Sequence, residues 1–314
     1  MSRILNIFKK LEAKSKTAFI PFITAGDSGL DNSEALVFTL ADSGADIIEL
    51  GMPFSDPMAD GPVIAKSHER AVAAGVNLHD VFAIVERFRE HNQTTGIVLM
   101  GYTNPIEVFG YKEFALRAHE AGVDGILVVD MPPEEVHDLK KELDKLEIDL
   151  IFLVAPTTTD VRLQYIAEMA TGYIYFVSLK GVTGAGNLDV ESVNHHLERM
   201  RKYFKLPVGV GFGISNAEVA KQVGENADAV IVGSALVSII EELSSDKDTM
   251  ITKVGNLAKE ISAENFSQKI EGVKVFGQGY AIWKSSSKRY HMTLKSCHHG
   301  RFHRHDDDCS MTLW

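Results

Sequence analysis

The sequence predicts an α/β fold, a (β/α)8 TIM barrel followed by a carboxyl-terminal extension. Three observations lead to this prediction. Eight short apolar runs follow one another along the chain, and each ends at or beside Gly, Pro, Ser, Thr or Asp. Amphipathic stretches with helical spacing fill the gaps between the runs, as in parallel α/β proteins. The 314 residues are enough for one barrel of about 250 residues with a segment to spare.

The apolar runs are short, as expected of parallel strands that are covered on both faces. An open, doubly wound sheet is the alternative arrangement of alternating strands and helices. That sheet would normally carry Gly-x-Gly-x-x-Gly after its first strand, and residues 24–27, Thr-Ala-Gly-Asp, do not fit this pattern. The count of eight favours the closed barrel. The predicted strands cover residues 18–24, 46–50, 96–100, 125–129, 150–154, 173–178, 208–210 and 229–232.

The stretches between these runs carry apolar residues at helical spacing, on the face that would cover a barrel. Residues 33–43 and 78–90 have the clearest stripe. The Pro-Pro-Glu-Glu run at 132–135 predicts the start of the fourth helix, because prolines and acids favour the first helical turn. The connection after residue 53 is long for one loop, so an extra helical turn is expected over residues 62–74.

Two domains of different character are expected, a catalytic barrel over residues 1–265 and an extension over residues 266–314. The extension has scattered aromatics and a His-rich run between Cys297 and Cys309. Cys and His at these spacings could bind a metal, but the run lacks the ligand spacing of zinc fingers. We therefore expect no metal site, and a disordered or non-native extension.

Composition excludes several classes of function. A net charge of −11 and a pI of about 5.6 argue against nucleic-acid and anionic-membrane surfaces. No apolar run reaches about 18 residues, and the amino end is too mixed for a secretory signal, so a cytoplasmic protein is expected. Both cysteines lie within the last eighteen residues, which leaves the predicted barrel without disulfide or thiolate chemistry.

Glu49 interrupts the apolar run of the second predicted strand. A carboxylate inside a sheet costs several kcal/mol unless it finds partners or takes up a proton, so this position predicts a raised pKa. The alternative is a Glu that points to solvent or pairs with a Lys. Residues 52–61 then form an irregular loop with two prolines that carries Asp60. The two carboxyl groups are candidates for an acid/base pair across one pocket.

The carboxyl ends of barrel strands gather the chemistry in this fold. The residues predicted there are mostly aromatic and aliphatic, which suits a flat apolar ring with one polar tail; the alternative is that they only fill the barrel. Three small-residue loops after strands six to eight could hold a phosphate with backbone N–H groups. The candidate substrate contacts are Phe22, Tyr102, Leu127, Tyr175, Thr183 and Phe212, and the candidate phosphate contacts are Gly184, Gly213, Gly233 and Ser234.

The run from Glu49 to Gly61, Glu-Leu-Gly-Met-Pro-Phe-Ser-Asp-Pro-Met-Ala-Asp-Gly, closely resembles the signature of the tryptophan synthase alpha chain family. The resemblance extends over about residues 1–265. It implies a lyase that cleaves indole-3-glycerol phosphate to indole and glyceraldehyde 3-phosphate by a retro-aldol step. Glu49 would move the protons of indole C3 and of the glycerol hydroxyl, and Asp60 would hold or take the N1 proton. No cofactor is implied in this chain.

The same resemblance implies a partner, a beta chain that uses pyridoxal phosphate to join indole to serine within an α2β2 heterotetramer. Three alternatives remain open from the sequence: a non-catalytic regulatory partner, a barrel isomerase of a related phosphorylated substrate, and a stand-alone lyase. The first two are disfavoured by the two retained carboxyls and by the lack of an isomerase's Lys or paired Asp. The residues expected to contact the beta chain are Asp56, Pro57, Asn104 and Pro132.

Overall fold

The computed structural model describes residues 2–178, 190–211 and 213–263, together with the backbone of four strands in the extension. The chain divides into two compact units, Met1–Gln268 and Lys269–Trp314. Each unit is described by itself.

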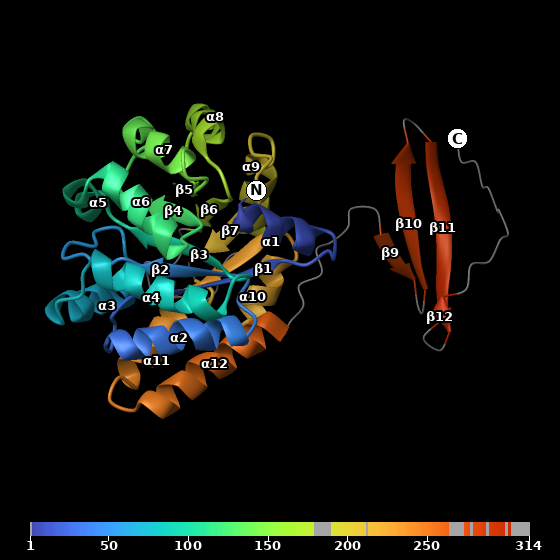
Figure 1. Cartoon of the computed structure of the whole chain (residues 1–314). Coiled ribbons are helices and arrows are strands. Elements are labelled where there is room, and N and C mark those ends of the chain that lie inside the picture. The colour runs from blue at the N-terminus through green and yellow to red at the C-terminus, as the bar shows by residue number, and fades with distance from the viewer. Residues whose placement is uncertain are drawn as a thin grey trace. The chain divides into compact units, whose positions relative to one another are not determined.

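The first unit is a closed barrel of eight parallel strands in chain order, with β1 hydrogen-bonded to both β2 and β8 (Figure 1). The predicted (β/α)8 barrel is therefore confirmed. Each predicted strand matches an observed one to within one residue or so at each end. The strands are β1 (Ala18–Thr24), β2 (Ile47–Gly51), β3 (Gly96–Gly101), β4 (Gly125–Val128), β5 (Asp149–Val154), β6 (Ile174–Val177), β7 (Val208–Gly211) and β8 (Ala229–Val232).

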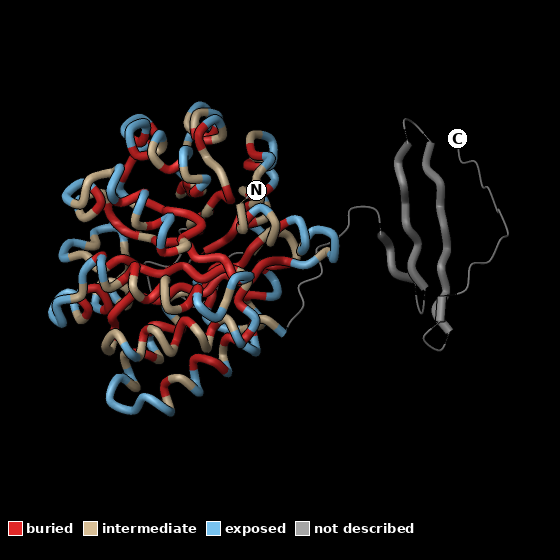
Figure 2. Tube along the Cα trace, viewed as in Figure 1, coloured by how far each residue is buried: buried red, intermediate tan, exposed pale blue. Residues whose placement is uncertain are grey.

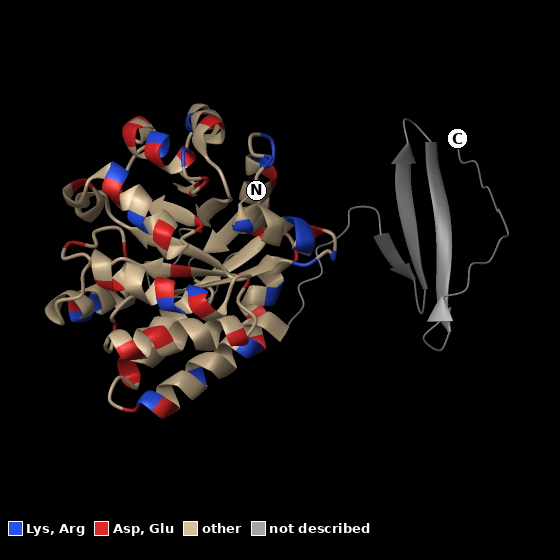
Figure 3. Ribbon diagram, in the orientation of Figure 1, with Lys and Arg blue, Asp and Glu red and all other residues tan. Residues whose placement is uncertain are grey.

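Helices surround the barrel, and their inward faces are buried while their outward faces are exposed (Figure 2). Most charged residues of this unit lie on these helices and on the loops between elements (Figure 3). The described helices are α1 (Arg3–Glu12), α2 (Leu30–Asp42), α3 (Pro62–Ala73), α4 (Leu78–His91), α5 (Thr103–Phe109), α6 (Tyr111–Ala121), α7 (His137–Asp144), α8 (Asp160–Met169), α9 (Val190–Met200), α10 (Ala217–Gly224), α11 (Ser234–Glu242) and α12 (Lys247–Ala263).

One helix starts later than the sequence predicts, and another confirms the sequence-based expectation. The prediction that a helix starts at the prolines of residues 132–135 is wrong, because α7 begins only at His137. The prolines instead form a turn in which the Glu135 N–H donates to the Pro132 carbonyl at 3.0 Å, and the chain then buries Val136 before the helix starts. The extra helical segment expected over residues 62–74 is confirmed: α3 is a helix of 12 residues with a proline in its first turn.

Helix α1 closes the amino-terminal end of the barrel. Its buried residues, Ile4 and Phe8, pack with side chains that fill the barrel interior. A side chain at Gly125, at the start of β4, would lie 3.0 Å from the tip of Ile4, so the glycine gives the helix room to pack. The Phe8 ring lies 5.9 Å from that of Tyr173, which continues the packing toward the other end of the barrel.

A buried charge cluster fixes the same end of the barrel. Asp124, before β4, accepts hydrogen bonds from Arg3, from the Ile97 backbone N–H and from Arg89, whose Nη2 lies 2.7 Å away. The remaining guanidinium N–H groups of Arg89 donate to the Gly122 and Thr95 carbonyls at 2.9 and 2.8 Å. Because every group is paired, the cluster can stay buried and tie α1, α4 and the strand starts together.

The second unit contains an antiparallel sheet of four strands in the order β12-β11-β10-β9. The longest pairing joins β10 to β11 from Gly279 opposite Ser296 to Ser286 opposite Arg289. No apolar period in the sequence indicated these strands, and the disordered or non-native character of the extension stays a prediction. The strands are β9 (Val273–Phe276), β10 (Gly279–Ser286), β11 (Arg289–His298) and β12 (Arg301–Phe302).

Candidate active site

Glu49 is fully buried inside the barrel. In register it lies beside Phe22 of β1 and Val98 of β3, so its side chain belongs to the interior face of β2. The Tyr173 hydroxyl donates a hydrogen bond of 2.5 Å to Glu49 Oε1, whereas Oε2 has no partner within the described part of the chain. The alternative of a solvent-facing or Lys-paired Glu is therefore wrong.

Burial sets the protonation of Glu49. It raises the pKa of the carboxyl to about 8, and the hydrogen bond from Tyr173 opposes this shift only in part. At neutral pH the carboxyl thus keeps its proton. The sequence predicted the raised pKa but not the tyrosine that holds the group. The signal was available, because Tyr173 and Tyr175 are two residues apart and therefore share the interior face of one strand.

Asp60 is held in the loop after β2 by a tyrosine from the next strand. The Tyr102 hydroxyl donates to Asp60 Oδ2 at 2.7 Å and accepts from the Ala59 N–H at 3.2 Å. Burial raises the pKa of Asp60, and the bond from Tyr102 lowers it. Burial and the nearby Asp60 raise the pKa of Tyr102 itself, so its hydroxyl keeps the proton that it donates.

His68 on α3 completes this group, and sequence reasoning missed it. Its Nδ1 accepts a hydrogen bond of 3.1 Å from the Phe54 N–H, and its Nε2 lies 3.6 Å from Asp60 Oδ2. The Phe54 ring stacks on Tyr102 with centroids 5.1 Å apart. Burial lowers the pKa of His68 to about 4, so the ring is neutral at physiological pH. From the sequence alone, a polar residue in a helix is expected to be exposed, and only the fold shows that this face of α3 is buried.

Of the predicted substrate contacts, those within the described residues lie in or beside the barrel interior. Phe22 and Leu127 are buried, and Tyr175 is half-buried beside them. A side chain at Gly211 would overlap the Tyr175 ring, so glycine at the end of β7 is what lets this ring lie across the barrel. Tyr102 lies with Asp60 as described above. Thr183 and Phe212 lie outside the described residues.

The predicted phosphate contacts follow β7 and β8. Helix α11 begins at Ser234 directly after Gly233, and no side chain among the described residues caps its first turn. The free N–H groups of an uncapped first turn suit an anion. Gly233 lies next to Phe22, since a Cβ there would come within 3.4 Å of the Phe22 ring. Gly213 has a φ of +81°, a backbone conformation that favours glycine, and Gly184 lies outside the described residues.

The predicted partner contacts follow the carboxyl ends of β2, β3 and β4, which is one face of a parallel barrel; Asp56, Pro57 and Pro132 lie in loops, and Asn104 lies in the first turn of α5. Asp56, Asn104 and Pro132 are exposed, and Pro57 is partly exposed. Met58, in the loop that also carries Asp60, is an exposed large apolar residue. These positions are compatible with a docking face, and contact with a partner stays a prediction.

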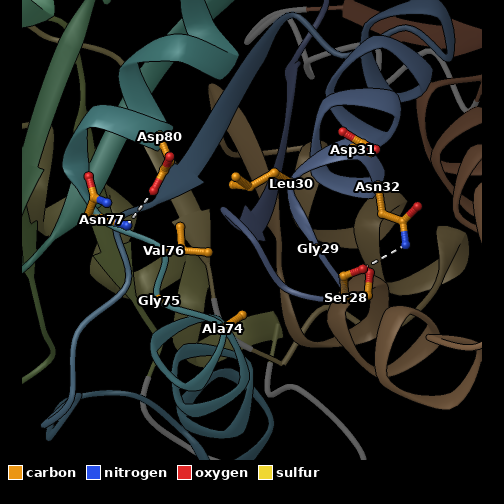
Figure 4. A pocket seen from close by; sticks show the side chains of 10 residues that line it. All are labelled: Ser28, Gly29, Leu30, Asp31, Asn32, Ala74, Gly75, Val76, Asn77 and Asp80. Atoms are coloured by element: carbon orange, nitrogen blue, oxygen red, sulfur yellow. Dashed lines mark hydrogen bonds between the residues drawn. The ribbon is translucent and has the colours of Figure 1, made fainter.

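A separate hollow of about 700 Å³ lies between the start of α2 and the turn that joins α3 to α4 (Figure 4). Its polar groups bond to one another: Asn77 N donates to Asp80 at 2.9 Å, and Asn32 Nδ2 donates to the Ser28 carbonyl at 2.7 Å. Neither candidate catalytic carboxyl lines it. Among the side chains that the structure describes, no three His, Cys, Asp or Glu gather as a metal site. The side chains of the His-rich run lie outside the described residues.

Comparison with known proteins identifies the family. The family model for the tryptophan synthase alpha chain matches residues 8–266. The chain belongs to this family. It is 62% identical over 262 residues to the tryptophan synthase alpha chain of Ruthia magnifica, covering 83% of this chain and 98% of the relative. It is 54% identical over 247 residues to that of Burkholderia pseudomallei strain K96243, covering 79% and 91%.

Solved structures of the family have the same fold. Tryptophan synthase subunit alpha of Legionella pneumophila matches with a TM-score of 0.79 at 41% identity, covering 84% of this chain and 98% of that one. A structure of Mycobacterium tuberculosis tryptophan synthase in its aminoacrylate-bound form matches with a TM-score of 0.76 at 32% identity, covering 84% and 100%. The family activity, a carbon–carbon lyase reaction on indole-3-glycerol phosphate in tryptophan biosynthesis, is thereby the activity of this chain. Within the described residues, no helix is long and apolar enough to span a membrane.

The shifted pKa of Glu49 predicts a pH-dependent cost in stability. Between its usual pKa of 4.5 and about 8, the folded protein holds a proton that the unfolded chain releases, so stability falls as pH rises through this window. Glu49→Gln removes this titration. We expect its free energy of unfolding, relative to the original protein, to rise by about 2 kcal/mol or more from pH 5 to pH 8.

Urea unfolding at the two pH values measures this change, and Glu242→Gln, at an exposed position, is the matched control. A difference between Glu49→Gln and the original protein that stays constant with pH would contradict a proton held on Glu49.

Proposed function

We propose that Glu49 and Asp60 are the general acid/base residues of the cleavage, and that the barrel, residues 1–265, carries the whole reaction. The reaction needs a proton at indole C3, loss of the proton from the glycerol hydroxyl, and an acceptor for the N1 proton. The observation that carries the proposal is the difference between the environments of the two carboxyl groups. Glu49 is a buried carboxyl that keeps its proton at neutral pH, and Asp60 is a carboxyl held by neutral donors.

Glu49 supplies the first proton. Its carboxylic acid protonates C3, which interrupts the ring conjugation and prepares the bond between C3 and the side-chain carbon to break. The resulting carboxylate then takes the hydroxyl proton as the carbonyl of glyceraldehyde 3-phosphate forms and the bonding electrons return to the indole ring. The group ends in its starting protonation state. Tyr173 donates to the same carboxyl and keeps it aligned through both transfers.

Asp60 acts at the ring nitrogen. It holds the N1 proton as positive charge develops on the protonated ring, and returns it when indole forms. Phe22, Leu127 and Tyr175, with Tyr102 at the edge, supply the apolar walls for the ring, and Thr183 and Phe212 complete this set. The phosphate binds to the backbone N–H groups of the loops that contain Gly184, Gly213 and Gly233 and to the start of α11 at Ser234.

The steps written above combine proton transfers with the breaking of one C–C bond whose electrons return to the indole ring, so the chain needs no metal or organic cofactor for them. Pyridoxal phosphate belongs to the proposed partner, a tryptophan synthase beta chain, in an α2β2 heterotetramer. The face with Asp56, Pro57, Asn104 and Pro132 is proposed as the contact, because the loop that carries Asp60 leaves the barrel there. The proposed location is the cytoplasm.

Removal of either carboxyl is expected to slow cleavage. Glu49→Gln and Asp60→Asn should each lower kcat for indole release by at least about a hundredfold, the usual size of a general acid/base contribution. Both variants should keep the fold, which circular dichroism checks. Glu120→Gln, on an exposed part of α6, is a control with unchanged turnover. Turnover close to the original in purified Glu49→Gln would refute the assignment.

Docking of a beta chain is expected to raise the alpha activity. Contacts to residues 56–58 would order the loop that carries Asp60, so we expect at least a tenfold gain, equal to about 1.4 kcal/mol of coupling. Steady-state cleavage is measured with and without the beta chain, and size-exclusion chromatography reports the complex. Absence of both gain and complex would replace this proposal with a stand-alone lyase that releases free indole.

A further inference from the structure

Two side chains, His68 and Tyr102, accept hydrogen bonds from backbone N–H groups of the loop over residues 52–61, one on either side of Asp56. The Phe54 N–H donates to His68 of α3, and the Ala59 N–H donates to the Tyr102 hydroxyl. His68 also lies edge-on to the Tyr102 ring, with centroids 6.3 Å apart. The two side chains that anchor the loop are therefore in contact with each other as well as with Asp60.

The hydrogen bonds of His68 define the tautomer of its ring. The ring is neutral in its buried position, so one nitrogen carries hydrogen and the other accepts. Because Nδ1 accepts from the Phe54 N–H, the hydrogen lies on Nε2, the nitrogen that faces Asp60. The distance of 3.6 Å from Nε2 to Asp60 Oδ2 is longer than a hydrogen bond. Side chains of catalytic groups often close such gaps only when charge develops or substrate binds.

We propose that His68 is a positioning residue for Asp60: its neutral ring fixes the loop through Nδ1 and directs the Nε2–H at the Asp60 carboxylate. The proposal rests on the proposed role of Asp60 at the indole nitrogen. Both donors, Tyr102 and His68, face Oδ2, which leaves Oδ1 for the N1–H of the substrate. Two neutral donors stabilise a largely buried carboxylate without a counter-ion, so Asp60 can still attract the positive charge of the protonated ring.

The titratable groups around Asp60 come from three elements. Tyr102 approaches from the position just after β3, His68 from α3 and Tyr175 from β6. Burial raises the pKa of Tyr175, and Asp60 raises it further. Glu49 acts on Tyr175 and Asp130 acts on Tyr102, each raising the pKa of that tyrosine. Neither tyrosine ionises at physiological pH. A change in the acid limb of the pH profile on substitution of His68 therefore reports on Asp60.

Two amide substitutions separate the two roles of the ring. In His68→Asn the side-chain carbonyl can take the place of Nδ1 and accept from Phe54, but the amide is too short to reach Asp60. In His68→Gln the amide N–H can take the place of the Nε2–H, while the acceptor for Phe54 is lost. If His68 only filled space, the two variants would not be expected to differ in these two hydrogen-bond-dependent effects.

The test is steady-state indole release from indole-3-glycerol phosphate across pH 5 to 9. For His68→Asn we expect kcat lower by about fivefold, the effect of one neutral hydrogen bond, with little change in KM. The acid limb of kcat/KM should move up by about 0.5 pH unit, because loss of a donor raises the pKa of Asp60. His68→Gln should keep kcat and the acid limb of kcat/KM as in the original protein. It should raise KM, because the loop loses its hydrogen bond from the Phe54 N–H. His119→Asn, exposed on α6, is the control.

Long-range ¹H–¹⁵N NMR of the unsubstituted protein reads the tautomer without activity. We expect hydrogen on Nε2 and no titration of His68 between pH 5.5 and 8. Hydrogen on Nδ1, titration near pH 6.5, or identical pH profiles for the original protein and both His68 variants would each overturn the proposal. Failure of the proposed function is distinguishable, because it would appear as an active Asp60→Asn protein whatever the His68 variants do.

Discussion

The hydrogen bond between Tyr173 and Glu49 in the closed barrel is the contact on which the rest of the site depends. Glu49 is fully buried, and among the described residues its carboxyl has one neutral donor, so it keeps its proton at neutral pH. The same tyrosine packs on Phe8 of α1, which closes the opposite end of the barrel. Helix α1 thus helps to hold Tyr173, and through it Glu49, in place inside the barrel. The interior packing that stabilises the barrel also sets the protonation of Glu49.

Asp60 is a carboxyl in a different environment. It lies on a loop, partly exposed, and two neutral side chains from separate elements face one of its oxygens. Two carboxyls with different burial and different donors can perform different proton transfers in one pocket. The two carboxyls are also held differently. Glu49 belongs to a strand of the barrel, whereas the position of Asp60 depends on the hydrogen bonds that hold its loop. An event that orders the loop therefore acts on Asp60 first, and this links the site to the face where a partner is proposed to dock.

The sequence predicted the barrel well because parallel strands buried on both faces leave short apolar runs that are hard to mistake. Glu49 could be found for the same reason, as the one residue that interrupts such a run. His68 could not be found, because a polar residue on an amphipathic helix looks exposed until tertiary packing brings it to Asp60. Tyr173 was included in a strand but given no role, since only strand register shows which residues meet across a barrel. The Pro-Pro-Glu-Glu run was misread because it forms a turn, closed by the Glu135 N–H on the Pro132 carbonyl, ahead of α7.

The central claim is that Glu49 holds a proton at neutral pH in the free protein. The most direct measurement is ¹³C NMR of protein labelled at the glutamate carboxyl carbon, with Glu49→Gln to assign the resonance. The structure predicts a protonated carboxyl at pH 6.5 that ionises near pH 8, with a midpoint that rises further in Tyr173→Phe because a donor to the carboxylate is lost. A Glu49 signal that is already that of a carboxylate at pH 6 would contradict the account.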